Sequence, residues 1–270
     1  MTHLLGVVGD PIAHSLSPFI QNGWLRANHI DAVYSAFEVK AGELPSGLDA
    51  LGRQGVIGLN ITLPHKEEAL QLATSASETA KRLGAVNFLV RRDNGWIGEN
   101  TDAPGFAMTL DYGDIDVAGR DIFLLGAGGS ARAVASVLAQ RGAQLTICNR
   151  TVARAEALAR DLAPGARVLG LKEAMQHLSS AAVAVNTLSL GHSGGNLELP
   201  QTVGGIFYDI SYGRGAAAAL AEARSKGWRV LDGLGMLVAQ AAISFEHWFG
   251  VLPDMAEAHA RCRKLVEATS

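Results

Sequence analysis

A glycine-rich turn is the part of the sequence whose residue types and spacing point most directly to chemistry. It follows an apolar run at 121–125, leads into a helical pattern that reaches Arg141, and reads Gly126-Ala127-Gly128-Gly129-Ser130-Ala131. This is the Gly-x-Gly-x-x-Gly/Ala fingerprint of a dinucleotide site, in the strand–turn–helix setting that it requires. Gly126 permits the tight turn, Gly128 admits a pyrophosphate close to the backbone, and Ala131 lets helix and strand pack closely. A turn without a ligand is the plain alternative, and this motif alone leaves the two about even.

The tip of the next predicted strand favours one dinucleotide over the other. The strand ends at Asn149-Arg150-Thr151, about 20 residues beyond the turn, where an NAD enzyme usually carries a carboxylate for the ribose hydroxyls. No acidic residue stands at this tip. Arg150, with Arg154 nearby, can instead pair with a 2′-phosphate through charge-assisted hydrogen bonds. The sequence therefore predicts NADP as the cofactor, against the alternative that Arg150 is a solvated surface residue.

Four polar clusters in the N-terminal part of the chain are a second source of chemistry. They are Ser15-Leu16-Ser17-Pro18, Asn60-Ile61-Thr62-Leu63-Pro64-His65-Lys66, Gly84-Ala85-Val86-Asn87 and Asn100-Thr101-Asp102. Lys66 suits a reaction that builds negative charge on an oxygen, because its ammonium is a compact charge and a proton donor. Asp102 could orient that ammonium, accept a substrate hydroxyl or share the proton, and the sequence leaves these roles open. Each cluster alone has an ordinary explanation as a solvated charge, a helix cap or a turn.

Together, these clusters resemble the motifs of the shikimate dehydrogenase family. The family's order continues through the glycine turn and the strand tip to Asp232-Gly233-Leu234-Gly235-Met236-Leu237 and Gln240, so the resemblance covers nearly the whole chain. It implies reversible, NADP-dependent reduction of 3-dehydroshikimate to shikimate in a cleft, with Lys66 and Asp102 as the catalytic pair. It also implies that Ser15 and Ser17 bind the substrate carboxylate, and that its hydroxyls are held by Asn60, Thr62, Asn87 and Gln240.

Further positions extend the two predicted sites. Asn186 and Thr187 end a predicted strand of the cofactor domain, where such sheets bind ligands, although a simple turn explains them nearly as well. The resemblance implies that Gly233 and Met236 lie near the nicotinamide and that Tyr212 points toward the substrate.

One segment departs from the family pattern. After Tyr212 the chain reads Gly213-Arg214-Gly215-Ala216, where the family commonly has Asn-Pro and a nearby Thr, which bears on substrate preference and closure. His14 and His65 flank the predicted substrate site, yet neither has a second ligand at metal spacing or a nucleophile beside it, so no metal is expected.

The elements that must position these residues are short apolar runs alternating with amphipathic segments. The runs lie at 4–9, 33–39, 58–61, 122–125, 145–148, 183–185 and 206–210. This alternation predicts an α/β protein with largely parallel sheets. We expect an α/β substrate-binding and catalytic domain at 1–103 and a Rossmann-type, doubly wound NADP-binding domain at 104–237. Helices in 238–270 are expected to return to the first domain.

Composition limits the partners. The chain has 270 residues, of which 48% are hydrophobic and 18% charged, and its net charge of −3 offers no field that attracts nucleic acid or anionic lipid. Cys148 and Cys262 lie outside any metal or redox spacing, which suits a reducing compartment. No membrane span or targeting segment is recognisable. We expect a cytoplasmic monomer or homodimer whose partners are small molecules.

Three alternatives stay open at this stage. A quinate/shikimate dehydrogenase of broader specificity would carry much the same motifs, although Arg150 argues against NAD. A catalytically silent, NADP-binding regulatory relative would keep the fold, but the presence of both Lys66 and Asp102 argues against it. An NADP dehydrogenase acting on a folate would also need a lysine, whereas the Ser15 and Ser17 pair suits a small carboxylate.

Overall fold

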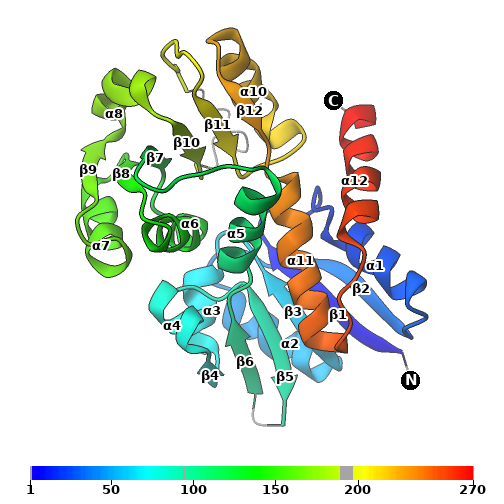
Figure 1. The fold of residues 1–270 in the computed structure, drawn as a ribbon. Coiled ribbons are helices and arrows are strands. Elements are labelled where there is room, and N and C mark those ends of the chain that lie inside the picture. The colour runs from blue at the N-terminus through cyan, green and yellow to red at the C-terminus, as the bar shows by residue number, and fades with distance from the viewer. Residues whose placement is uncertain (1, 94, 189–196, 270) are drawn as a thin grey trace. The chain divides into compact units, whose positions relative to one another are not determined.

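The chain forms two compact units, each built on its own sheet. The computed structural model describes residues 2–93, 95–188 and 197–269. The first unit comprises Met1–Gly105 and Leu237–Ala258, and the second comprises Phe106–Met236 and His259–Ser270. Within the described residues, each unit holds one six-stranded sheet flanked by helices (Figure 1). The predicted α/β class with a Rossmann-type domain is confirmed, whereas the division of substrate and cofactor between the units stays a prediction.

The sheet of the first unit is mixed, and its register brings distant segments to one edge. Its strands are β1 (His3–Gly9), β2 (Ala32–Glu38), β3 (Val56–Ile61), β4 (Ser75–Ala76), β5 (Phe88–Arg92) and β6 (Gly95–Glu99), in the order β2-β1-β3-β5-β6-β4. Strand β1 is parallel to β2 and β3, while β5 is antiparallel to both β3 and β6. Asn60 pairs with Phe88, and Phe88 pairs with Glu99. The end of β3, the start of β5 and the end of β6 therefore meet at the same edge.

Local sequence signals explain where several helices of the first unit begin and end. The helices are α1 (Ser17–Ala27), α2 (Leu44–Arg53), α3 (Lys66–Leu72) and α4 (Glu78–Leu83). Proline stands in the first turn of α1 and of α2, where its missing N–H costs no helical hydrogen bond. Helix α4 is capped by the Ser77 side chain, which accepts from the Ala80 N–H, and it stops at the left-handed Gly84.

Helices α5 (Asp102–Tyr112), α11 (Leu234–Phe249) and α12 (Met255–Thr269) contain the boundaries of the two units. The part of α11 in the first unit buries its apolar side chains, and the ring of Phe245 lies 5.8 Å from that of Trp24. The sequence assigns 238–270 to the first domain, but the residues from His259 onward group with the second unit. Within that unit, Arg263 of α12 forms a forked ion pair with Asp232, with N···O distances of 2.5 and 2.9 Å.

The sheet of the second unit is parallel throughout. Its strands are β7 (Asp121–Leu125), β8 (Gln144–Asn149), β9 (Arg167–Gly170), β10 (Val183–Asn186), β11 (Ile206–Asp209) and β12 (Arg229–Leu231), in the order β12-β11-β10-β7-β8-β9. Its other helices are α6 (Gly129–Gln140), α7 (Val152–Leu162), α8 (Leu171–His177) and α10 (Arg214–Ser225). This is the doubly wound strand order of dinucleotide-binding domains, and it reverses between β7 and β10. Ligands of such sheets bind beside the carboxyl ends of the strands at that reversal.

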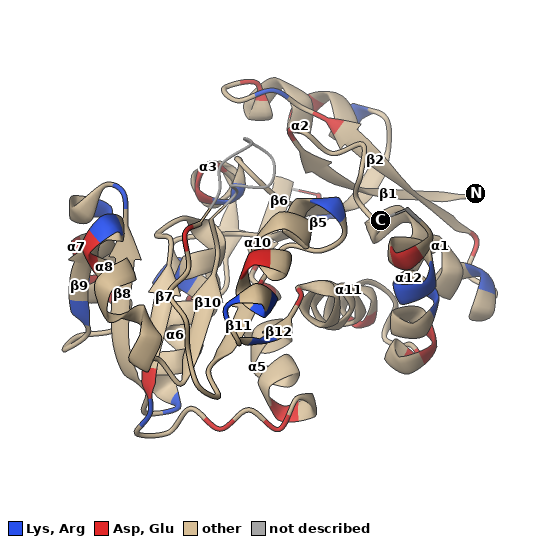
Figure 2. Cartoon of the chain, turned by 90° about the horizontal axis from the view of Figure 1, so that it is seen from above, with Lys and Arg blue, Asp and Glu red and all other residues tan. Residues whose placement is uncertain are grey.

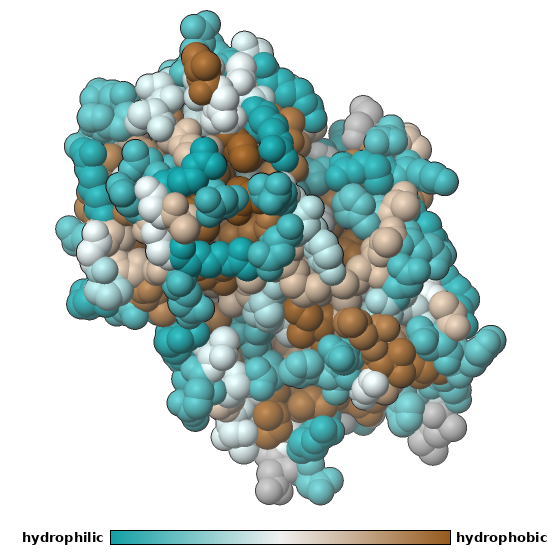
Figure 3. All heavy atoms as spheres, viewed as in Figure 1, coloured by the Kyte–Doolittle hydropathy of each residue, from teal (hydrophilic) through white to brown (hydrophobic). Residues whose placement is uncertain are grey.

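Charged and apolar residues are mixed over the surface. Figure 2 shows basic and acidic residues on the same elements, for example on α12. On the face drawn in Figure 3, hydrophilic residues are interspersed with hydrophobic ones, as is usual for folded chains. Across the described segments, no helix has both the length and the apolar character that a bilayer crossing requires.

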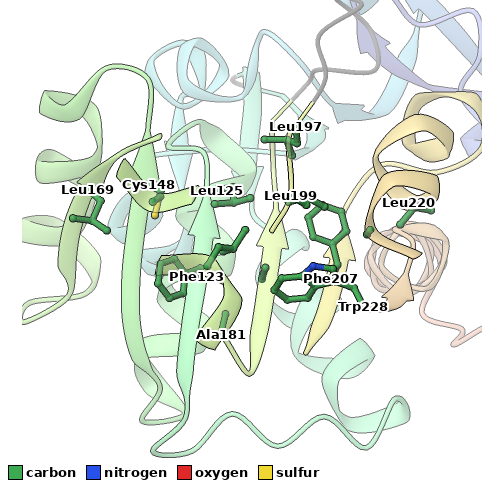
Figure 4. Packing of buried hydrophobic residues seen from close by; sticks show 14 of the residues in the cluster. Phe123, Leu125, Cys148, Leu169, Ala181, Leu197, Leu199, Phe207, Leu220 and Trp228 are labelled. Atoms are coloured by element: carbon green, nitrogen blue, oxygen red, sulfur yellow. The ribbon is translucent and has the colours of Figure 1, made fainter. Parts of the chain in front are cut away.

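A hydrophobic cluster on one side of the second sheet holds the strands and the flanking helices together. Phe123 and Leu125 of β7, Phe207 of β11 and Trp228 before β12 belong to it (Figure 4). The rings of Phe207 and Trp228 lie edge to face with centroids 6.3 Å apart, and Phe207 is fully buried. This packing fixes β11 between its neighbours and so fixes the polar residues at its carboxyl end.

Replacing Phe207 by Ala is expected to destabilise the fold by about 3–5 kcal/mol. Removal of the buried aromatic ring leaves a cavity that the surrounding side chains cannot fill. The urea midpoint followed by circular dichroism measures the effect. Val203→Ala is the control, since Val203 is fully exposed and its truncation is expected to change stability by less than about 0.5 kcal/mol. Equal midpoints for both variants would contradict this account of the core.

Candidate active site

The edge of the first sheet collects the polar residues that the sequence singles out. Asn60 lies near the end of β3, Asn87 immediately before β5, and Asp102 opens α5 after β6. Lys66 opens α3, which follows β3 after a short turn. Since the register aligns these strand ends, residues far apart in the sequence reach one place without any special loop.

Lys66 and Asp102 form a close ion pair. The Lys66 Nζ lies 2.6 Å from Asp102 Oδ2, and the two side chains are only 12% and 6% exposed. Ion pairs in so dry a place interact more strongly than surface pairs, but both charges lose hydration and must be held by further hydrogen bonds. The predicted proximity of these two side chains is therefore found, while their role in a reaction stays a prediction.

Asn87 supplies the second hydrogen bond to Asp102, and its orientation is fixed by the backbone. The Thr101 N–H donates to Asn87 Oδ1 at 2.7 Å, so the oxygen of that amide must face Thr101. Asn87 Nδ2 then donates to Asp102 Oδ1 at 2.9 Å and to Thr101 Oγ1 at 3.0 Å. Each oxygen of Asp102 thus accepts from a different donor, which holds the carboxylate in one orientation against Lys66.

Asn60 is also held inside the unit. Its Nδ2 donates to Ser244 Oγ at 2.9 Å and to the Asn87 carbonyl at 3.3 Å, and its Oδ1 accepts from the Tyr34 hydroxyl at 2.7 Å. Burial raises the pKa of Tyr34 well above its usual value, so its phenol keeps the proton that it donates. Both N–H groups of the Asn60 amide are therefore used, and a ligand can bond only to its oxygen.

The other predicted substrate ligands differ in burial. Ser15 lies partly exposed between β1 and α1, and its Oγ accepts from the N–H of the buried Ser17, the first residue of α1. Thr62 is half-buried after β3, and Gln240 on α11 donates to the Leu237 carbonyl at 2.8 Å. Tyr212 is half-buried and follows β11 in the second unit.

The two histidines that flank these residues differ in environment. His65 is buried, with its Nε2 2.7 Å from the Val39 carbonyl, whereas His14 is exposed. In the part of the chain that the structure describes, no three His, Cys, Asp or Glu side chains gather as a metal site would require.

The glycine turn of the second unit has the geometry that its sequence suggests. Gly126 has φ +116°, and a Cβ there would lie 2.3 Å from Thr187 Oγ1, which itself donates to the Leu125 carbonyl at 2.8 Å. Ala131 is fully buried against the sheet. A Cβ on Gly128 would meet nothing within 4 Å, so the backbone at the start of α6 is open to a ligand. These residues fit a bound pyrophosphate.

The tip of β8 exposes a positive charge. Arg150 follows the strand and is exposed, as are Thr151 and Arg154 at the start of α7. The Asn149 side-chain amide donates to the Thr151 carbonyl at 3.0 Å, an exposed local hydrogen bond that shapes the tip. Arg150 thus follows the carboxyl end of β8, the strand next to β7, where an arginine could pair with a 2′-phosphate.

The end of β10 is held by a buried acid that the sequence analysis did not single out. Asn186 donates to Asp209 Oδ2 at 2.8 Å, and its own Oδ1 accepts the Leu188 N–H. Asp209 ends the neighbouring β11, where burial raises the pKa of its carboxyl group. The Asn186 side chain therefore stabilises the turn that follows β10. An acidic residue at a strand end of a parallel sheet was the signal that could have identified Asp209.

Gly233 is a glycine because two backbone segments cross there. A Cβ at this position would lie 1.8 Å from the Ile210 carbonyl oxygen, and the Gly233 N–H donates to Ser211 O at 2.8 Å. Asp232 accepts the Leu234 N–H at 3.2 Å and so caps α11, in which Met236 is buried. This geometry explains the glycine without reference to a ligand.

Comparison with known proteins identifies the relationship. Three family models match: the shikimate dehydrogenase substrate binding domain at 7–89, shikimate / quinate 5-dehydrogenase at 111–192, and the shikimate 5′-dehydrogenase C-terminal domain at 233–259. A shikimate dehydrogenase (NADP(+)) of Hyphomonas neptunium is 82% identical over 270 residues, covering 100% of both chains. The chain belongs to the shikimate dehydrogenase family. The resemblance found in the sequence is thus confirmed.

Solved structures of shikimate dehydrogenases, and of enzymes with other names, share the fold. The shikimate 5-dehydrogenase of Thermus thermophilus in complex with NADP(H) and shikimate is 34% identical, with a TM-score of 0.82, covering 97% of this chain and 99% of that one. The 5-ketofructose reductase of a Gluconobacter strain is 28% identical with a TM-score of 0.76, covering 98% and 99%. Because both share the fold, the substrate must be argued from side chains.

The departure from the family pattern after Tyr212 has a local structural consequence. Gly213 adopts φ +55° and ψ −138°, a conformation that residues with a Cβ avoid. Helix α10 begins at the next residue, and the Gly213 carbonyl accepts the Ala216 and Ala217 N–H groups. The glycine is therefore required by the start of α10 in this chain.

Replacing Gly233 by Ala is expected to lower the stability of the ligand-free protein by about 1–3 kcal/mol, because the added methyl group must displace the Ile210 backbone. Thermal unfolding without cofactor measures this effect apart from binding. Gly170→Ala is the matched control, since its Cβ would meet only Val152 Cγ2 at 3.8 Å. A normal melting temperature for Gly233→Ala would mean that the close approach is not a constraint.

Proposed function

We propose that this chain is an NADP-dependent shikimate dehydrogenase, which reversibly reduces 3-dehydroshikimate to shikimate with Lys66 and Asp102 as its catalytic pair. The observation that carries the catalytic assignment is the buried 2.6 Å contact between Lys66 Nζ and Asp102 Oδ2. The substrate and cofactor are supported by the 82% identical relative, named shikimate dehydrogenase (NADP(+)), and by the related structure that contains NADP(H) and shikimate.

The protein's own residues would stabilise the charge that develops on the substrate oxygen and transfer its proton. NADP, when bound, supplies or accepts the hydride at the ring carbon. The Lys66 ammonium donates a proton to the ketone oxygen, on which negative charge builds during reduction. Asp102 keeps that ammonium in place, and Asn87 keeps Asp102 in place through its 2.9 Å hydrogen bond. In the oxidative direction the neutral Lys66 amine takes the proton back.

The proposed substrate ligands contact two different ends of the substrate. Ser15 and Ser17 donate their hydroxyl hydrogens to the carboxylate. The ring hydroxyls are held by Asn60, Thr62, Asn87, Gln240 and Tyr212. A site built from such groups disfavours analogues that lack the matching hydroxyl, because its own polar atoms would be left unpaired.

The proposed cofactor ligands follow the strand ends of the second unit. The phosphates would be held by the turn Gly126-Ala127-Gly128-Gly129-Ser130-Ala131, and the adenosine end by Asn149, Arg150, Thr151 and Arg154. Asn186, Thr187, Gly233 and Met236 would shape the nicotinamide end. Arg150 is the residue that separates NADP from NAD, since its exposed guanidinium can form a fork with a 2′-phosphate.

Several finer features belong to the same proposal. The first unit is the substrate-binding domain and the second the NADP-binding domain, and the enzyme acts in the cytoplasm as a monomer or homodimer. Its net charge of −3 supports small molecules rather than nucleic acid as partners. Size-exclusion chromatography with light scattering tests the oligomeric state.

Quinate is the second candidate substrate. The family model that matches 111–192 describes shikimate / quinate 5-dehydrogenases, so this relationship leaves both acids open. Steady-state rates with shikimate and quinate, each with NADP and with NAD, decide between strict and shared use. NADP binding without turnover on either acid would favour a silent regulatory relative.

Lys66→Ala is expected to lower turnover of shikimate roughly 10²–10⁴-fold, because the developing oxygen charge loses its proton donor. The affinity for NADP is expected to stay nearly unchanged. Reduction of NADP followed spectrophotometrically gives the rates, and Lys81→Ala, at an exposed lysine paired with Glu78, is the control. Near-normal turnover of Lys66→Ala would remove this lysine from the mechanism.

Arg150→Ala is expected to raise the KM for NADP roughly 10- to 100-fold, because a charge-assisted hydrogen bond to the 2′-phosphate is lost. The KM for NAD is expected to change little. Arg160→Ala is the matched control, since Arg160 is exposed on α7, the helix that follows Arg150. If both dinucleotides were affected equally, Arg150 would not discriminate between them.

A further inference from the structure

Ser244 is a buried hydroxyl at the edge of the first sheet to which the proposed reaction assigns no role. It lies on α11, one turn beyond Gln240, and is completely buried. Its hydroxyl donates to the Gln240 carbonyl at 2.9 Å and accepts from Asn60 Nδ2 at 2.9 Å. Thr101 Oγ1 lies 3.3 Å away. Since the single hydrogen of Ser244 is used on a carbonyl, Thr101 must be the donor in that last contact.

Thr101 connects Ser244 to the proposed catalytic pair. Its Oγ1 accepts from Asn87 Nδ2 at 3.0 Å, and the other hydrogen of that amide reaches Asp102 Oδ1 at 2.9 Å. Asp102 in turn holds Lys66. We call this chain of hydrogen-bonded side chains the Ser244 network. It runs from Ser244 through Thr101 and Asn87 to Asp102.

The Ser244 network is dry, so its hydrogen bonds have no solvent competitor. Its members are exposed by 0% at Ser244, 1% at Thr101, 2% at Asn87 and 4% at Asp102. In such surroundings hydrogen bonds are strengthened, and each one restricts the orientation of the next. Without the Ser244 hydroxyl, the Thr101 hydrogen could turn to Asn87 Oδ1, which lies 3.4 Å away. One N–H of Asn60 would also lose its partner.

We propose that Ser244 is a positioning residue of the reaction: its hydroxyl fixes Thr101 and Asn87 and thereby holds Asp102 in the orientation that presents Lys66. The inference rests on the proposed function, because it gives Asp102 and Lys66 their catalytic roles. It adds α11 to the elements that orient the pair, through a contact between residues 143 positions apart.

The test is Ser244→Ala in the full chain, assayed for NADP reduction by shikimate. We expect kcat to fall roughly tenfold, as for the loss of an orienting buried hydrogen bond, with the KM for NADP unchanged. Ser136→Ala is the matched control, since Ser136 is also a buried helical serine with a side-chain partner, Gln140, but lies on α6 outside the network. Its kcat is expected to be normal.

A double substitution separates positioning from general destabilisation. In an Asp102→Asn background, assayed at higher enzyme concentration, Ser244→Ala is expected to have little further effect, because the carboxylate that it orients is already gone. Thr101→Val breaks the same connection from the other side and replaces Ser244→Ala if that variant does not fold. Equal fold-losses in both backgrounds would overturn the proposal, as would a normal kcat for Ser244→Ala or, in its place, Thr101→Val.

The activity of the unsubstituted chain separates a failure of this proposal from a failure of the proposed function on which it rests. If it fails to oxidise shikimate or quinate, the proposed function is wrong and the inference falls with it. If it is active while the network variants behave like Ser136→Ala, only the role of Ser244 is overturned.

Discussion

A buried ion pair imposes the constraint on which the first unit depends. Lys66 and Asp102 are both largely removed from water, and leaving one of them without its partner costs about 3–5 kcal/mol in comparable sites. Such a pair is tolerable where further hydrogen bonds help to hold the two charges. The mixed sheet meets this demand because the antiparallel β5 brings Asn87 to the edge at which β3 and β6 end. The fold therefore places two charges and the amide that steadies them before any ligand is present.

Local signals in the sequence are sufficient for much of the second unit. Gly126 has a positive φ and lies beside Thr187, where there is no room for a Cβ. Ala131 is fully buried and must be small. Both residue types are therefore predictable from the strand–turn–helix pattern. The parallel order with its reversal beside β7 follows from the alternation of strands and helices. Strands β5 and β6 are harder to predict. They carry exposed Arg91 and Arg92 and an interior Gly98, and so lack the continuous apolar run of a buried strand.

The hydrogen-bonded surroundings of the predicted residues lay beyond sequence reasoning. Tyr34 and Ser244 reach Asn60 from 26 and 184 positions away, and Arg263 reaches Asp232 from 31 positions away. No periodicity or local spacing encodes such contacts, because they arise only when the sheet and its helices pack. The closeness of Lys66 and Asp102 likewise came from the family resemblance and not from their separation of 36 residues. A long-range polar contact is thus the feature least accessible to a single sequence.

The amide orientations set by these contacts constrain which ligand fits the first unit. Both N–H groups of Asn60 and of Asn87 are committed to protein acceptors, so neither amide has a hydrogen left for a ligand. Asn60 can still accept through its oxygen, which suits a ligand hydroxyl and repels a carboxylate. The hydroxyls of Ser15 and Ser17, by contrast, are able to donate. The proposed substrate, a small acid with ring hydroxyls and a carboxylate, meets both requirements.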